Sequence, residues 1–366
     1  MIRTLFVLAA GVALAPGQPL YPLARALGQA PQIARAEQAL SVTMSGGETV
    51  PSGLVVALGY QTAKELNSDF WTRRLRRLAS EVADGSAILS ALDRRSLAEG
   101  TSTTAALQLG RALALSPQGP GAATFRTARQ HFTDAQLTEI TAVVAYYSYA
   151  IRLAQALGPQ ESADDPLPKL GEPILSTARL STPGPDQLSF LSELRANASP
   201  VFRLLFYVPQ KGRSLLRLDA AVTSSASSDS RMPRLLAAFT SAHVNSCRYA
   251  TTSAVHALLA AGVPAKKIAG AVESDRVYSA SEAAVVAFAR KLTIQPEAVT
   301  PADLRALEKT VGKRVAFDVL MESAWSALWQ RLSDGIHLPP NPAAQRSYRE
   351  VFGQDFPQVS EGQRKP

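Results

Sequence analysis

Apolar residues recur three and four positions apart along most of the 366-residue chain. This spacing is typical of amphipathic helices that pack on a core, and no stretch shows the sustained alternation of a half-buried strand. The pattern therefore predicts an all-α fold. In the first half we expect helices over residues 21–38, 52–66, 70–82, 103–115 and 134–157, the last of them N-capped by Thr133 and closed by Gly158 and Pro159.

The second half continues in the same way after residues 159–185, a stretch rich in Pro, Gly and Ser that we predict to be a linker. A Ser-rich segment, 223–230, is expected to be a surface insertion without a counterpart in the first half. The Pro-, Gln- and Arg-rich tail, 339–366, is expected to be loosely ordered. Helices are predicted over residues 187–196, 200–207, 233–243, 247–261, 265–272, 281–292, 301–310 and 314–335.

Residues 67–157 and 246–336 resemble each other at a constant shift of 179 positions, without a gap. A fixed shift through apolar, charged and helix-breaking positions indicates an internal duplication. We therefore predict two helical modules, copy one over residues 20–158 and copy two over 186–338, whose last helices touch around residues 143–150 and 319–327. The matching pairs include Phe70 and Tyr249, Arg111 and Arg290, Leu113 and Leu292, Pro117 and Pro296, Arg152 and Arg331.

The net charge and its distribution along the chain indicate which classes of partner to expect. The net charge of +8 would suit an acidic partner or an anionic membrane surface. Arginines are spread along the chain, however, and the densest group lies in a helix-like stretch, where a solvated face is expected. No aromatic-and-basic recognition pattern accompanies them, so we expect no nucleic-acid partner. That group consists of Arg73, Arg74, Arg76 and Arg77.

Signs of a cofactor are also missing. The four histidines and the single cysteine show no metal-ligand spacing, and no phosphate loop or dinucleotide fingerprint occurs. We therefore expect neither a cofactor nor a bound metal. One cysteine also excludes a disulfide within the chain.

The first residues, 1–19, carry an early cation, Arg3, and then an apolar run, 4–15, that ends in the small-x-small triplet Ala13-Leu14-Ala15. This order resembles a secretory signal, and the run is short for a membrane span. One expectation is therefore a periplasmic, secreted or envelope-associated protein. The other is an ordinary N-terminal helix on a cytoplasmic protein, because Pro16 would follow the cleavage bond and a single cation is few.

Cys247 begins an apolar helix that ends near Gly262. If Asn245 or Ser246 caps this helix, the cysteine lies in its first turn, where free N–H groups and the positive end of the dipole stabilise a thiolate. His243 lies just before and could reach the sulfur to lower its pKa or shuttle its proton. The alternative is that Cys247 is a small buried hydrophobe, as free cysteines usually are.

The other aromatic and histidine candidates are weaker. His256 lies nine residues after Cys247, about 180° away on an ideal helix, so we expect a packed or partly exposed side chain. Trp325 and Trp329, four residues apart, either line an aromatic pocket or pack between helices, with Tyr146 matching Trp325 in copy one.

The segment around Cys247 resembles the alkylhydroperoxidase D-like and carboxymuconolactone decarboxylase superfamily. Its modules carry Asn-Cys-x-Tyr-Cys-x-x-x-His, a Gly about fifteen residues after the first Cys, and later an Ala/Phe/Lys-rich helix followed by Leu-Thr. Here Cys247, Tyr249 and Gly262 match, as do residues 287–293, 301–304 and 331–332. The resemblance covers both copies but not the N-terminal run, the linker or the tail. It implies two tandem all-helical modules of this type and a peroxidase-like site at Cys247.

The catalytic positions depart from that pattern. Ala250 and Ala254 stand where the superfamily has its second cysteine and its histidine, and no carboxylate lies near residues 234–236, where the relay glutamate belongs. In copy one the two cysteine positions and the histidine position hold Ser68, Trp71 and Leu75.

Two hypotheses follow. In the first, Cys247 reacts with a peroxide or a small apolar substrate and is resolved by an external thiol, with His243 assisting, because one thiol cannot close a dithiol cycle. In the second, the chain is a catalytically silent relative that binds an apolar ligand or a protein partner. Both are compatible with association of whole chains into a homo-oligomer.

Overall fold

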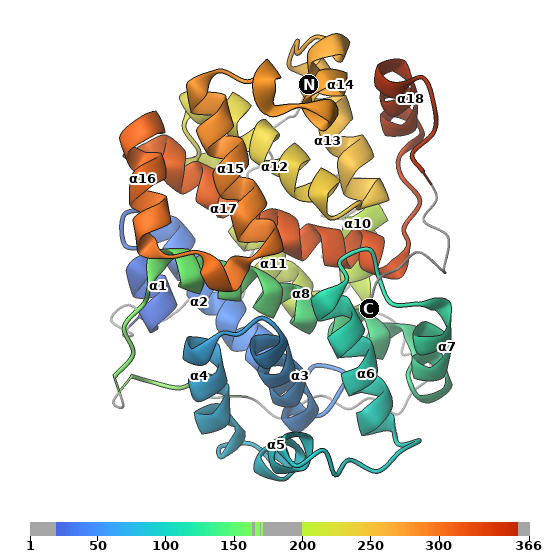
Figure 1. The fold of residues 1–366 in the computed structure, drawn as a ribbon. Coiled ribbons are helices and arrows are strands. Elements are labelled where there is room, and N and C mark those ends of the chain that lie inside the picture. Colours follow the sequence, from blue (N-terminus) through green and yellow to red (C-terminus); the bar gives the residue numbers. More distant parts are fainter. Residues whose placement is uncertain (1–19, 163–164, 169, 171–199, 358–366) are drawn as a thin grey trace.

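The computed structural model describes residues 20–162, 165–168, 170 and 200–357, and every regular element within these ranges is a helix (Figure 1). The predicted all-α fold is therefore confirmed. Among the described helices, none combines the length and apolar composition needed to cross a bilayer. The signal-like run 1–19, most of the linker and the expected helix 187–196 lie outside the described residues.

The helices of the first half end at the long helix that was predicted over residues 134–157. Its bounds are confirmed, with a capping box between Thr133 and Gln136 at its start and Gly158, at a φ of 58°, at its end. The elements are α1 (Pro22–Ala26), α2 (Pro31–Ser45), α3 (Ser52–Glu65), α4 (Asp69–Ala79), α5 (Gly85–Asp93), α6 (Ser102–Leu115), α7 (Ala122–His131) and α8 (Asp134–Leu157).

The second half repeats this succession. Each helix from α1 to α8 has a counterpart among α10 to α17. The counterpart begins 179 positions later, to within one residue. The elements are α10 (Pro200–Leu204), η1 (Leu205–Tyr207), α11 (Pro209–Ser225), η2 (Ser228–Ser230), α12 (Arg231–Val244), α13 (Arg248–Ala260), α14 (Ala265–Glu273), η3 (Asp275–Val277), α15 (Ala280–Ile294), η4 (Pro296–Ala298), α16 (Pro301–Val311), α17 (Lys313–Ser333), η5 (Asp334–Ile336) and α18 (Pro342–Phe352).

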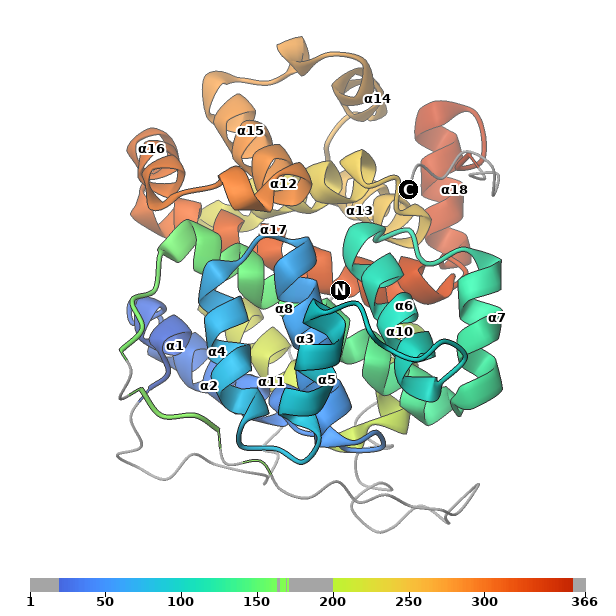
Figure 2. The ribbon, with the colours of Figure 1, turned by 60° about the horizontal axis from the view of Figure 1, so that its bottom comes forward.

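Equivalent helices meet at the centre of the molecule. α8 packs along α17 and α2 packs along α11, so one continuous apolar core runs through both halves (Figures 1 and 2). The predicted contact between the last helices of the two copies is confirmed, and the rings of Tyr149 and Trp325 meet there edge to face at 5.3 Å. Trp325 also lies edge to face with Trp329 at 5.5 Å, so this aromatic pair packs between helices.

Two buried arginines cross this central contact reciprocally. Arg152 of α8 donates from Nη2 to the carbonyl of Thr293 at the end of α15, at 3.1 Å. Its counterpart Arg331 of α17 donates from Nη2 to the carbonyl of Ala114 at the end of α6, at 2.7 Å. A guanidinium at a helix C-terminus satisfies carbonyls that lack a partner in the helix. Each half therefore caps a helix of the other.

Three predictions are corrected. The helix expected over 21–38 is two helices, because the chain turns after Leu27 and Pro31 starts α2 in a first turn that tolerates proline. Segment 223–230 is not an insertion, since α11 reaches Ser225 and the remainder corresponds to the loop between α2 and α3. The tail is not loose throughout, since α18 packs on α13 with Ala344 and Tyr348 buried.

Candidate functional site

Cys247 lies at the junction of α12 and α13. The chain leaves α12 through Ser246, which has a φ of 51°, and Cys247 is itself the N-cap of α13. The expectation that Asn245 or Ser246 caps the helix is therefore wrong, and the cysteine lies one position before the first turn. Copy one builds the same junction, because Asn67 has a φ of 51° and Ser68 is the N-cap of α4.

The start of α13 is occupied by a carboxylate from the end of α17. Asp334 accepts the backbone N–H of Tyr249 at 2.7 Å and of Ala250 at 3.2 Å. These are the free N–H groups that would otherwise stabilise an anion at a helix N-terminus. Burial raises the pKa of Asp334 to about 6, against the lowering effect of these bonds. The carboxylate of Asp334 thus already compensates the positive end of the α13 dipole.

The thiol itself is enclosed and held protonated. Cys247 is fully buried, and its Sγ lies 3.7 Å from Oε1 of Gln330 and 3.8 Å from the carbonyl of Asn245, both acceptors. Burial raises the pKa of Cys247 well above its usual value, and the negative charge of Asp334 raises it further, while Arg331 opposes them. The expected lowering of the pKa is therefore wrong, since acceptors and a carboxylate surround the sulfur.

His243 packs against an aromatic ring. Its imidazole stacks on the ring of Phe239, with centroids 5.7 Å apart and an interplanar angle of 10°. Burial lowers the pKa of His243, and the nearby charge of Arg290 lowers it further. The hydrogen bonds of the described residues include none between His243 and Cys247. The structure brings the two residues to one helix junction without a hydrogen bond between them.

A loop from the first half closes over this junction. Gln118 donates from Nε2 to the carbonyl of Asn245 at 2.8 Å. Gly119 follows with a φ of 104°, and a Cβ there would lie 2.9 Å from the carbonyl oxygen of Asp334 and 2.8 Å from that of Gly335. Only a residue without a side chain fits such a close approach at this φ. The loop between α6 and α7 therefore packs closely on the segments that flank Cys247 and Asp334.

Copy one has an aromatic cluster around Trp71, which matches Ala250 at the shift of 179. Trp71 packs edge to face on Tyr147 at 5.3 Å and on Tyr146 at 6.4 Å. The hydroxyl of Tyr146 donates to Oε1 of Glu37 at 2.9 Å, and Oε2 of Glu37 has no hydrogen-bond partner in the described chain. Burial raises the pKa of Glu37 to about 7. This half therefore carries a buried acid in its core, on α2, whereas the position that matches Cys247 holds Ser68.

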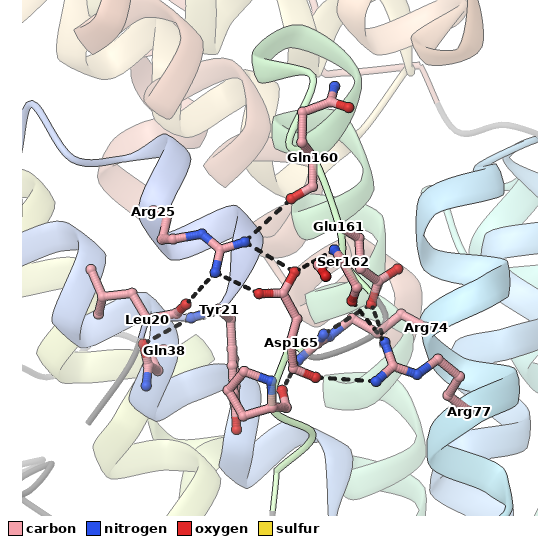
Figure 3. Close-up of polar contacts among 11 residues, drawn as sticks. Leu20, Tyr21, Arg25, Gln38, Arg74, Arg77, Gln160, Glu161, Ser162 and Asp165 are labelled. Carbon is pink, nitrogen blue, oxygen red and sulfur yellow. Dashed lines mark hydrogen bonds and ion pairs between the residues drawn. The ribbon is translucent and has the colours of Figure 1, made fainter.

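Three of the four arginines in the basic cluster on α4 pair with acids of the same chain: Arg74, Arg76 and Arg77. Figure 3 shows Arg74 and Arg77 pointing at Glu161, in the segment that follows α8, at 3.1 and 3.2 Å. Arg25 of α1 pairs with Asp165 of that segment at 2.5 Å. The first residues of the predicted linker are thus fastened to α1 and α4. Instead of forming a wholly solvated face, Arg74 is buried in an ion pair.

A cavity that the sequence reasoning missed opens at a junction of the halves. It has a volume of about 280 Å³ and lies between α7, α8, the α10–η1 segment and the end of α17. An ion pair between Arg129 and Asp134, at 2.7 Å and exposed, lies at its rim. Its apolar lining comprises Phe125, Leu137, Leu204, Tyr207, Leu332 and Ile336.

Comparison of the copies contains the signal for this cavity. Thr138 and Thr141 line it, and the shift of 179 sets Phe317 and Leu320 against them. The residues around Cys247 have a fainter signal: Gln330 and Asp334 are polar positions at the end of α17 and just after it, but nothing local assigns them to the thiol.

No protein-family model, curated protein or solved structure matches this chain. The resemblance to the alkylhydroperoxidase D-like superfamily therefore rests on the residues that carry it.

Proposed function

We propose that this protein is a catalytically silent relative of the alkylhydroperoxidase D-like superfamily that binds a small apolar ligand. The observation that carries this proposal is the state of Cys247: buried, hydrogen-bonded to acceptors and next to Asp334. A peroxidatic cysteine reacts as its thiolate, and a thiol with a pKa above 9 is less than about 1% ionised at pH 7. The chain has no second thiol to resolve Cys247, and no hydrogen bond joins His243 to it.

In this proposal the chain consists of two tandem modules that arose by duplication. The recurrence of helix starts at a shift of 179 supports it, as does the reciprocal capping by Arg152 and Arg331. Reciprocal contacts of this kind are what two copies make across a two-fold interface. One chain would thereby supply the pairing that single modules obtain by association. Homo-oligomerisation of whole chains and export through residues 1–19 stay predictions.

The test is peroxide turnover by the full-length protein. Cumene hydroperoxide is supplied with dithiothreitol as the external thiol, and its consumption is compared for the wild type and Cys247→Ser. We expect both proteins to match the rate without protein, because the thiol stays protonated and enclosed. Consumption by the wild type that Cys247→Ser abolishes would overturn the proposal and restore the one-cysteine peroxidase, with peroxide as substrate and a thiol as reductant.

A further inference from the structure

The two halves differ most clearly where α7 and its counterpart α16 pack. α16 lies along α17 and also touches α8, whereas α7 packs mainly on α6 and only lightly on α8. In both views the two helices lie at opposite edges of the molecule, as equivalent elements of the two halves (Figures 1 and 2). The cavity opens beside α7, at the edge where the packing of the second half is not repeated.

Two threonines of the cavity wall match larger residues in the second half. Phe317 and Leu320 of α17 are buried at 1% and 0% exposure and belong to the apolar core. At the equivalent positions α8 has Thr138 and Thr141, which line the cavity. Replacing a phenylalanine by a threonine removes most of the volume of a ring, and close-packed interiors do not collapse fully around such a loss. At these two positions α8 therefore fills less volume than α17 does.

The volume sets the size of a ligand. An engineered cavity of about 150 Å³ with Leu, Ile and Phe walls holds a benzene molecule. The cavity beside α7, at about 280 Å³, is roughly twice as large, and its wall adds two threonines and an ion pair to the apolar side chains. A molecule of two fused rings, or an aliphatic molecule of equal volume, fits this space.

The polar groups of the wall set the charge of a ligand. Thr138 Oγ1 donates to the carbonyl of Asp134 at 2.7 Å, and Thr141 Oγ1 donates to that of Leu137 at 2.8 Å, so both hydroxyl protons are used within α8. At the rim, Arg129 and Asp134 neutralise each other. An ionic ligand would lose its hydration shell and find no unpaired opposite charge, which is unfavourable.

We infer that this cavity binds a neutral, apolar molecule of about two fused rings, with the ring system between α7 and α8. The inference rests on the proposed binding function for its biological sense, but the site and ligand class come from the cavity alone. Tyr207, which is 45% exposed, lies at the mouth between solvent and the apolar wall.

The experiment is calorimetric titration of the full-length protein with indole and, separately, with indole-3-carboxylate. We expect saturable binding of indole and at least tenfold weaker binding of the carboxylate. Thr138→Phe, which copies the residue of the second half, should weaken indole binding at least tenfold because the ring occupies the site. Thr310→Phe, at an exposed position of α16, is the matched control and should bind indole as the wild type does.

The outcomes test the site and the ligand class separately. Indole binding that is not saturable, or that Thr138→Phe leaves unchanged, overturns the site. Carboxylate binding as tight as that of indole overturns the neutral class. Thr141→Leu repeats the test if Thr138→Phe does not fold, as judged by thermal unfolding. If indole does not bind and Cys247 is unreactive, the cavity proposal fails and the protein is still catalytically silent. If indole binds and Cys247 reacts with peroxide, only the proposal of a catalytically silent protein fails.

Discussion

The buried acid of copy one gives a pH dependence of stability that can be worked out from the structure. Glu37 is 1% exposed, and burial raises its pKa from the ordinary 4.5 to about 7. The folded protein therefore holds this proton more tightly than the unfolded chain. Its contribution to stability is present below pH 4.5 and is lost as the pH rises towards 7. A pKa difference of this size corresponds to about 3 kcal/mol.

Glu37→Gln removes this titration and keeps an acceptor for the hydroxyl of Tyr146. Urea unfolding would be measured near pH 5 and near pH 8 for the variant and the wild type. We expect the wild type to lose about 2–3 kcal/mol more than the variant between these two conditions. Other titrating groups, including Asp334, act in both proteins and cancel in the comparison. Glu81→Gln, at an exposed position, should follow the wild type. An equal loss in Glu37→Gln and the wild type would refute the reasoning.

Two further predictions concern the contact between the halves. Gly119→Ala should lower the free energy of unfolding by about 1–3 kcal/mol and speed the labelling of Cys247. The reason is that a Cβ at a φ of 104° meets the carbonyls of Asp334 and Gly335. An unchanged thermal midpoint would contradict this prediction. Arg331→Met should cost about 3–5 kcal/mol in urea unfolding, since it leaves carbonyls at the end of α6 unpaired; a stable variant would show that the guanidinium contributes little.

The sequence predicted most of the long helices because their apolar spacing and end signals are local. Thr133 and Gly158 bound α8 as expected, since a capping box and a residue with positive φ act within a few positions. Helices α5 and α7 were missed because they are short and bury little: Gly85 and Leu89 in α5, and Ala128 in α7. Short helices with a weak apolar stripe depend on tertiary contacts.

The site could be predicted only in part, for a related reason. The place of Cys247 at the start of a helix follows from neighbouring residues. Its environment comes from Gln330 and Asp334, because the hydrogen bonds to Cys247 and Tyr249 span 83 and 85 positions of the chain. The comparison at a shift of 179 positions contains a further signal, because Thr138 matches Phe317 and the pair differs in side-chain volume.

The most direct test of the central claim is the rate of Cys247 alkylation by iodoacetamide, in the folded protein and in urea, over a range of pH. The account predicts a folded-state rate at least about 100-fold below that of the unfolded chain, as an opening free energy near 3 kcal/mol implies. It also predicts no inflection below about pH 9. A folded protein that reacts faster than the unfolded chain, with an inflection near neutral pH, would contradict the account and identify Cys247 as an activated thiolate.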